Sequence, residues 1–257
     1  MNAAELMDRA DRNADAMRLV AEKAAIYRAS GAVGDLVRLR DSRLAAGRQV
    51  DAATTLNWPE DPGAMQPVER SQDKAGVMPE VDVRDLSVEA ITDAMRDHGA
   101  LIVRNMFSPR AAYEMRLEIE AVFEAAGEYM EGRSAGKEDK RSTNSKAAFM
   151  PVAEDASMGF ISKKGFLGQS GSVGTFHSPR FSQRLLDAFE ALGLRGMLQS
   201  YFRDEPCVSL YKSVLRRTEP LQHAAEWHQD GAFMTQGIKS LNLWVSLTNC
   251  GAGTESP

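Results

Sequence analysis

The stretch WHQDGAFMTQGIKSLNLWVSLTN, residues 227–249, decides the predicted fold. Its second part, from Ser240 to Thr248, alternates between aliphatic and other residues, which is the pattern of a β-strand with one dry face. Its first part contains His228 and Asp230, whose side chains lie on the same side of an extended strand. An imidazole and a carboxylate are two of the three groups in the facial triad that holds non-haem Fe(II). The stretch therefore predicts a metal site inside a β-barrel or jelly roll, although a His-x-Asp tripeptide alone also occurs by chance in surface turns.

The two faces of the predicted 240–248 strand differ in chemistry. Trp244 shares one face with Asn242 and Ser246, while the other face is aliphatic. Because an aliphatic face needs a dry surface, we expect it to pack on an outer layer of helices and Trp244 to point into the barrel. The alternative is that Trp244 only fills the core. The aliphatic positions are Leu241, Leu243, Val245 and Leu247.

Both parts of the stretch resemble the phytanoyl-CoA dioxygenase family of Fe(II)/2-oxoglutarate oxygenases. The resemblance is carried by Trp227–Met234 and Leu241–Gly251, and it extends from about Val81 to Pro257. It implies an α+β fold, a double-stranded β-helix (a cupin-like jelly roll) flanked by helices. It also implies an oxidoreductase that binds iron and uses 2-oxoglutarate and O2 to hydroxylate a small organic or acyl-type substrate.

The resemblance also assigns roles to single residues. His228 and Asp230 match the first two iron ligands, so they are the implied metal-binding and catalytic residues. Trp244 matches a position that lines the 2-oxoglutarate pocket, and Asn242 shares its face. In halogenating relatives a chloride takes the place of the carboxylate ligand, so the presence of Asp230 implies hydroxylation.

A second alternating segment precedes the metal pair. Residues 207–216 alternate in the same way and predict the first long strand of the barrel. Lys212, or its neighbour Leu210, falls near a further pocket-lining position of the family, so Lys212 is a candidate for binding the co-substrate.

The sequence departs from the family after Asp230, because no His, Arg or Asp follows it. Family members have their third iron ligand, a His, on a later strand, and then an Arg or similar cation for the far carboxylate of 2-oxoglutarate. We therefore expect an incomplete barrel, either in a fragment of a longer protein or in a natural truncation without activity. An upstream histidine, His223 or His177, is a third alternative for the missing ligand. The competing function is a non-catalytic double-stranded β-helix protein that binds a ligand or a partner chain.

Upstream of this region the chain divides into two further parts. Residues 1–48 predict an N-terminal helical extension, because apolar residues recur at helical spacing, and the extension is a candidate surface for a homodimer. Residues 49–79 predict a linker or arm, because Pro and Gly interrupt every pattern. The N-terminal part of the dioxygenase domain is expected over residues 80–257. Helices are expected at residues 1–30, 36–46, 88–98, 109–126 and 180–192, short strands at residues 81–83 and 100–104, and a loop at residues 131–146.

The composition excludes several classes of partner. The 257 residues carry a net charge of −5, with 26% charged residues, which offers no basic surface for nucleic acid or an anionic membrane. No apolar run approaches the ~20 residues of a membrane span, and the N-terminus becomes charged at once, unlike a signal peptide. Two cysteines make no disulfide framework. We therefore expect a cytoplasmic protein that binds small molecules.

Overall fold

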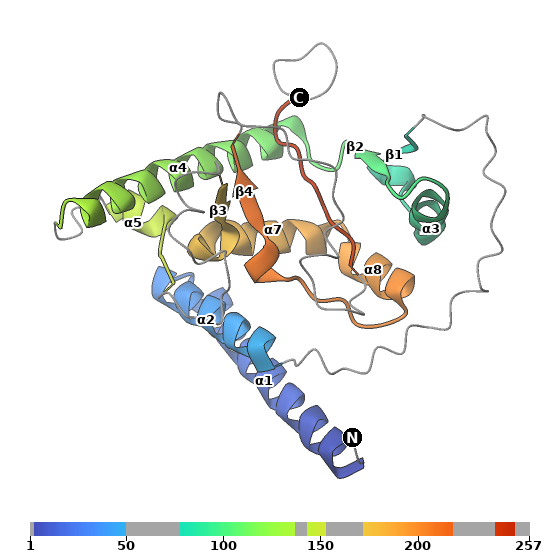
Figure 1. Cartoon of the computed structure of the whole chain (residues 1–257), viewed down its shortest axis with the longest axis horizontal. Coiled ribbons are helices and arrows are strands. Elements are labelled where there is room, and N and C mark those ends of the chain that lie inside the picture. The colour runs from blue at the N-terminus through green and yellow to red at the C-terminus, as the bar shows by residue number, and fades with distance from the viewer. Residues whose placement is uncertain (1–2, 50–77, 137–142, 153–171, 218–239, 250–257) are drawn as a thin grey trace.

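The computed structural model describes residues 3–49, 78–136, 143–152, 172–217 and 240–249. These residues form a mixed fold that is mostly helical and contains two small sheets (Figure 1). The fold is compatible with the predicted α+β class. The predicted linker at residues 49–79 and most of the segment that follows residue 152 lie outside the described residues. No described helix is long and apolar enough to cross a membrane.

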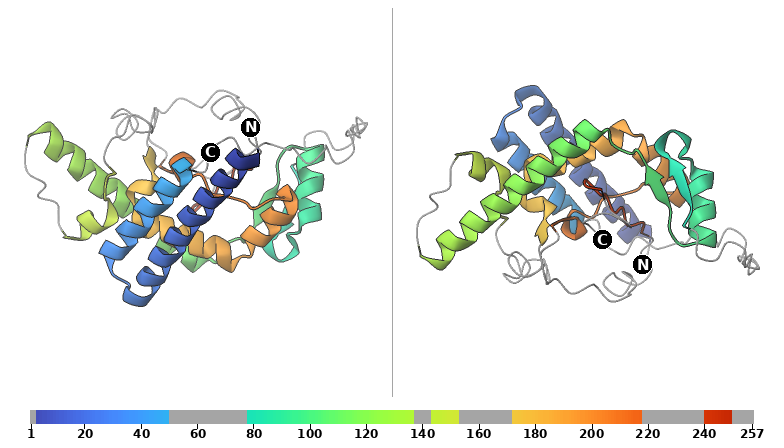
Figure 2. Two further views of the ribbon diagram at one scale, coloured as in Figure 1. Left: turned by 90° about the horizontal axis from the view of Figure 1, so that it is seen from below. Right: turned by 90° about the horizontal axis from the view of Figure 1, so that it is seen from above.

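The N-terminal extension is a pair of helices, α1 (Ala3–Ser30) and α2 (Val33–Gln49), which pack side by side (Figure 2). Gly31 ends α1 in a left-handed conformation, with φ of 62° and a hydrogen bond from its N–H to the Tyr27 carbonyl. The two helices confirm the prediction for this region. However, Gly47 lies inside α2 and does not end it.

The first sheet is a parallel pair, β1 (Glu80–Asp82) and β2 (Ile102–Arg104), with Val81 opposite Val103. A short 3-10 turn, η2 (Val83–Asp85), and helix α3 (Val88–Asp97) connect the two strands. Ser87 caps α3, because its Oγ accepts a hydrogen bond from the N–H of Ala90 at 3.1 Å. The strand–helix–strand order confirms the prediction for this segment.

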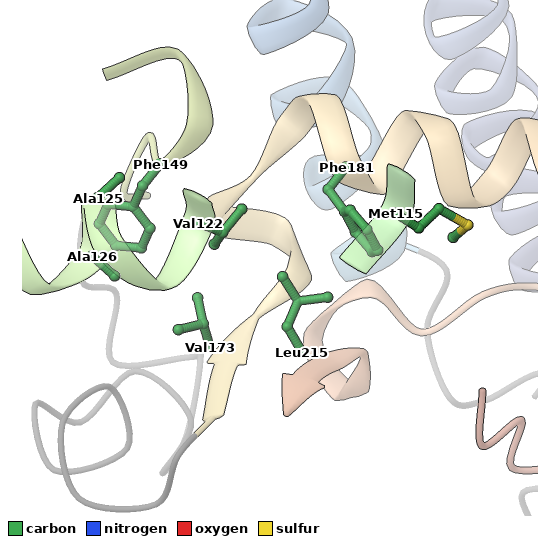
Figure 3. Close-up of a cluster of buried hydrophobic side chains, with 8 residues drawn as sticks. All are labelled: Met115, Val122, Ala125, Ala126, Phe149, Val173, Phe181 and Leu215. Atoms are coloured by element: carbon green, nitrogen blue, oxygen red, sulfur yellow. The ribbon is translucent and has the colours of Figure 1, made fainter. Parts of the chain in front are cut away.

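The main core lies between α4 (Pro109–Ser134), α5 (Thr143–Ala148), α7 (Pro179–Ala191) and the second sheet (Figure 3). Helix α4 begins at its predicted first residue, where Ser108 Oγ accepts a hydrogen bond from the N–H of Ala111, but the helix continues into the segment predicted as a loop. The core residues are Met115, Val122, Ala125, Ala126, Phe149, Val173, Phe181 and Leu215.

The second sheet is an antiparallel pair, β3 (Ser172–Gly174) and β4 (Val214–Arg216), with Val173 opposite Leu215. A 3-10 turn, η4 (Thr175–His177), leads from β3 into α7, and Gly193 separates α7 from α8 (Leu194–Phe202). A further 3-10 turn, η5 (Leu210–Lys212), precedes β4.

The predicted jelly roll is wrong for the part of the chain that the structure describes, where the strands form no closed barrel. Residues 207–216 do not form one long strand. The N–H groups of Lys212 and Ser213 instead bond to the carbonyls of Ser209 and Leu210, which are local 3-10 contacts that leave only three residues for β4. Residues 240–249 are not a strand either. Alternation sets the two faces of a segment, but a strand also needs a neighbouring backbone to bond to, and alternation does not supply one.

Candidate functional site

The predicted site residues fall into two groups. His228 and Asp230, like the alternative ligand His223, lie outside the described residues. Lys212 lies in η5, immediately before β4, while Asn242 and Trp244 lie in residues 240–249. The described residues alone contain no group of three His, Cys, Asp or Glu side chains that could hold a metal ion.

Residues 240–249 lie against β4 (Figure 1). Leu247 packs on the main core, which includes Leu215 of β4. The guanidinium carbon of Arg216 lies 5.5 Å from the centre of the Trp244 ring, in a cation–π contact. The Arg216–Trp244 contact therefore joins the segment to β4, and Leu247 joins it to the main core.

Along this segment the aliphatic side chains are mostly more buried than the side chains on the face of Trp244, as the sequence predicts. Leu241, Val245 and Leu247 are half-buried, whereas Asn242 is exposed and Trp244 is 81% exposed. Leu243 departs from the pattern, since it is also exposed. In the structure Trp244 therefore lies on the surface, stacked on Arg216.

Arg216, which contacts Trp244, was not among the residues singled out from the sequence. It is exposed, and no carboxylate of the described residues forms an ion pair with it. Lys212 and Arg217 lie close to it in the chain, and Arg217 stacks over Phe123 at 4.8 Å. In the sequence, the only feature that could have pointed to Arg216 is the Arg216–Arg217 pair at the end of an alternating segment. The last residue of β4 thus places one cation, Arg216, beside an exposed indole.

Lys212 and Leu210 occupy different environments. Lys212 is exposed, while Leu210 is half-buried and packs on a small cluster made by Leu44 and Phe176. Both residues were candidates for lining a 2-oxoglutarate pocket. Of the two, only Lys212 has a side chain that a dissolved ligand could reach.

His177 has a packing role in the structure. Its ring is only 6% exposed and lies 4.2 Å from the Phe176 ring and 5.3 Å from the Phe149 ring, measured between centroids. Its Nδ1 accepts a hydrogen bond from the N–H of Val152 at 3.2 Å. Burial, together with the nearby Arg40 cation, lowers the pKa of His177 to about 4, so the ring is neutral at pH 7. This enclosed ring, with one nitrogen already bonded, is poorly placed to be the third iron ligand.

Arg40 is a buried cation, and its burial was not predicted from the sequence. Its Nη1 donates to the carbonyl oxygen of Met150 at 2.7 Å and to that of Phe176 at 3.5 Å, and its guanidinium also pairs with Asp41 at 2.8 Å. Because buried charges need several partners, these bonds tie α2 firmly to the chain around His177. The N-terminal helix pair is therefore attached to the core through a specific polar contact.

Comparison with known proteins adds no relative. No protein-family model, no curated protein and no solved structure matches the chain.

Proposed function

We propose that this chain carries the iron-binding part of an Fe(II)/2-oxoglutarate-dependent dioxygenase that hydroxylates a small organic or acyl-type substrate. His228 and Asp230 are the proposed metal ligands and catalytic residues. The proposal includes O2 and 2-oxoglutarate as co-substrates and a cytoplasmic location, and it excludes nucleic acid and membrane as partners.

The observation that supports the proposal most is the placement of residues 240–249. In this segment Leu241, Val245 and Leu247 are half-buried, Leu243 is exposed like Asn242 and Trp244, and Trp244 contacts Arg216 of β4. The metal pair precedes this segment by ten residues, from Asp230 to Ser240. Ten residues of chain span at most about 35 Å, which limits how far the proposed metal pair can lie from this segment.

The side chains of His228 and Asp230 are suitable ligands for ferrous iron. In non-haem oxygenases a neutral imidazole and a carboxylate bind the iron and leave other coordination positions for 2-oxoglutarate and oxygen. The bound iron would supply the redox chemistry. Two protein ligands leave the metal under-coordinated, so we expect weak binding and little or no turnover by residues 1–257.

The co-substrate would bind through charge and stacking. 2-Oxoglutarate is a dianion, so Lys212 and Arg216 are the proposed cations for its far carboxylate. The Trp244 ring would form one wall of the pocket, and its indole N–H, like the Asn242 amide, can donate a hydrogen bond to a carboxylate.

Anaerobic titration of residues 1–257 with Fe(II) and 2-oxoglutarate tests this function. We expect weak 2-oxoglutarate binding that requires the metal and disappears in His228→Ala and in Asp230→Ala. Gln229→Ala is the matched control, because it changes the residue between the two ligands and should leave binding unchanged. Binding that persists in both ligand variants, or no metal-dependent binding at all, would contradict the proposal.

A non-catalytic acid-binding protein is the second candidate. The exposed Arg216–Trp244 pair favours it, because a stacked guanidinium and indole can bind an organic acid without a metal. Quenching of tryptophan fluorescence by 2-oxoglutarate in the presence of a chelator, lost in Arg216→Met but kept in His228→Ala, would favour this function over the oxygenase.

A further inference from the structure

The helix pair α1 and α2 is attached to the rest of the protein at a small interface. Figure 1 shows the pair extending from one side of the molecule, and α2 contacts α7 there. Within the described part of the chain, the main core and the side chains packed against it include no residue of α1 or α2. Leu44 of α2 belongs instead to a separate small cluster with Phe176, and Arg43 donates a hydrogen bond to Oε1 of Gln183 in α7 at 2.7 Å. The pair can therefore move away without opening the main core.

The buried guanidinium of Arg40 connects this interface to His177. Arg40 donates to the carbonyl oxygens of Met150 and Phe176 at 2.7 Å and 3.5 Å. Both carbonyls belong to the backbone that encloses His177, because Phe176 precedes it in the chain and the N–H of Met150 donates to the His177 carbonyl at 2.7 Å. The docking of α2 and the structure around His177 therefore depend on each other.

The neutral form of His177 suits this interface and the protonated form does not. Its Nδ1 accepts a hydrogen bond from the Val152 N–H at 3.2 Å, and a protonated Nδ1 carries a hydrogen and cannot accept one. Protonation also adds a positive charge near Arg40, in a buried place where water screens the repulsion poorly. Burial and, to a lesser extent, the Arg40 cation lower the pKa of His177 to about 4. Acid therefore opposes the docking of α2 in two ways.

The other ionisable groups near this ring leave the conflict in place. Asp41 of α2 pairs with Arg40 at 2.8 Å, but its side chain is 55% exposed, so water weakens its compensating charge. Tyr129 of α4 stacks on Phe149, whose ring lies between it and the imidazole. Arg180, in the first turn of α7, is exposed and carries the same sign of charge as the protonated ring.

We propose that α1 and α2 form a detachable unit, which Arg40 holds on the core and which protonation of His177 releases. The proposal is independent of the proposed dioxygenase function. Local opening of this kind occurs where few apolar contacts hold an element in place. Because the docked ring has the lower pKa, docking is fully favoured above pH 6.5 and weakens as the pH falls towards 4. The equilibrium constant for docking should fall by up to about tenfold per pH unit over this range.

Thiol labelling of the folded protein tests the release, in a chain whose own cysteines are replaced through Cys207→Ser and Cys250→Ser. Leu44→Cys places a thiol in the interface, and Val122→Cys places one in the main core. A pyridyl disulfide modifies each buried thiol only when it becomes exposed, and dividing by the rate of the urea-unfolded variant at the same pH removes the intrinsic pH dependence. Circular dichroism checks that each variant is folded.

We expect the interface thiol to react faster than the core thiol at every pH from 7 to 4. Its corrected rate should rise by up to about tenfold per pH unit below pH 6.5. Equal rates for the two thiols would show that the helix pair leaves only when the whole protein unfolds, and would overturn the proposal.

Substitutions at His177 and Arg40 test the two parts of the proposal separately. In His177→Phe the acid-induced rise in the rate of the interface thiol should be lost, whereas His98→Gln, which changes the histidine at the end of α3, should leave it unchanged. Arg40→Met should raise the rate at pH 7 at least about tenfold, because it removes charged hydrogen bonds to two carbonyls. Arg18→Met, which removes an exposed cation of α1, should not raise it. An acid-induced rise of the same size in His177→Phe, or an unchanged rate in Arg40→Met, would refute the proposal.

Discussion

His177 should make the folded protein sensitive to mild acid. Its buried, neutral ring has a pKa of about 4, compared with an ordinary value of 6.5. Between these two values the unfolded chain binds a proton at this position that the folded chain does not bind. Because the folded pKa is the lower one, the contribution of His177 to stability is fully present above pH 6.5 and is lost as the pH falls towards 4.

The magnitude follows from the difference between the two pKa values. A difference of about 2.5 corresponds to about 3 kcal/mol, since one pKa unit is worth about 1.4 kcal/mol. That is a large share of the roughly 5–15 kcal/mol that stabilises a typical domain. The free energy of unfolding should therefore fall by up to about 1.4 kcal/mol per pH unit between pH 6.5 and 4 from this residue alone.

Urea denaturation of the wild type and of His177→Phe, at several pH values between 7 and 4, isolates the effect. Phenylalanine keeps an aromatic ring between Phe149 and Phe176 but cannot be protonated. It also removes the acceptor for the Val152 N–H, so the variant should be about 1–3 kcal/mol less stable at pH 7. The stability of the wild type relative to the variant should fall by about 3 kcal/mol as the pH falls to 4, so that the variant becomes as stable as the wild type or more stable. A difference that stays constant across this range would refute the reasoning, because His177 would then have no depressed pKa.

Two further predictions concern stability at neutral pH. Gly174→Ala should destabilise the protein by about 1–3 kcal/mol, because the new Cβ would lie 2.5 Å from Cε1 of the buried Phe176 ring. In contrast, Gly127→Ala on the open surface of α4 should stabilise it by roughly 0.5–1 kcal/mol, and thermal unfolding of both variants checks the contrast. Ser87→Ala should cost about 1 kcal/mol by removing the cap bond to the Ala90 N–H, whereas Ser87→Asp should be nearly neutral, and hydrogen exchange in α3 would show whether the loss is local. Equal effects of the two glycine variants, or of the two serine variants, would contradict these assignments.

Most helices could be predicted from local residues. Helix α1 ends at Ser30 and α4 begins at Pro109, which are the predicted end and start of these two helices. The longer reach of α4 could not be predicted, because charged residues at 131–134 suit a helix and a loop equally well.

The candidate site could be predicted only in part. Alternation separated the half-buried Leu241, Val245 and Leu247 from the side that carries Trp244, but it was wrong for Leu243, which is exposed. It could not show which side would meet water, since that depends on what lies on either side of the segment. The prediction that His228 and Asp230 bind iron stays a prediction, as does the role of Lys212.

The sequence by itself determined the helices, their caps and the faces of its alternating segments, because these depend on bonds and side-chain directions within a few residues. Tertiary structure alone decided that β3 pairs with β4 over three residues, that Arg216 meets Trp244, and that Arg40 is buried. The Arg40 bond to the Phe176 carbonyl joins residues 136 positions apart. No local sequence pattern predicts such a contact, because it forms and contributes to stability only after the rest of the chain has brought the two groups together.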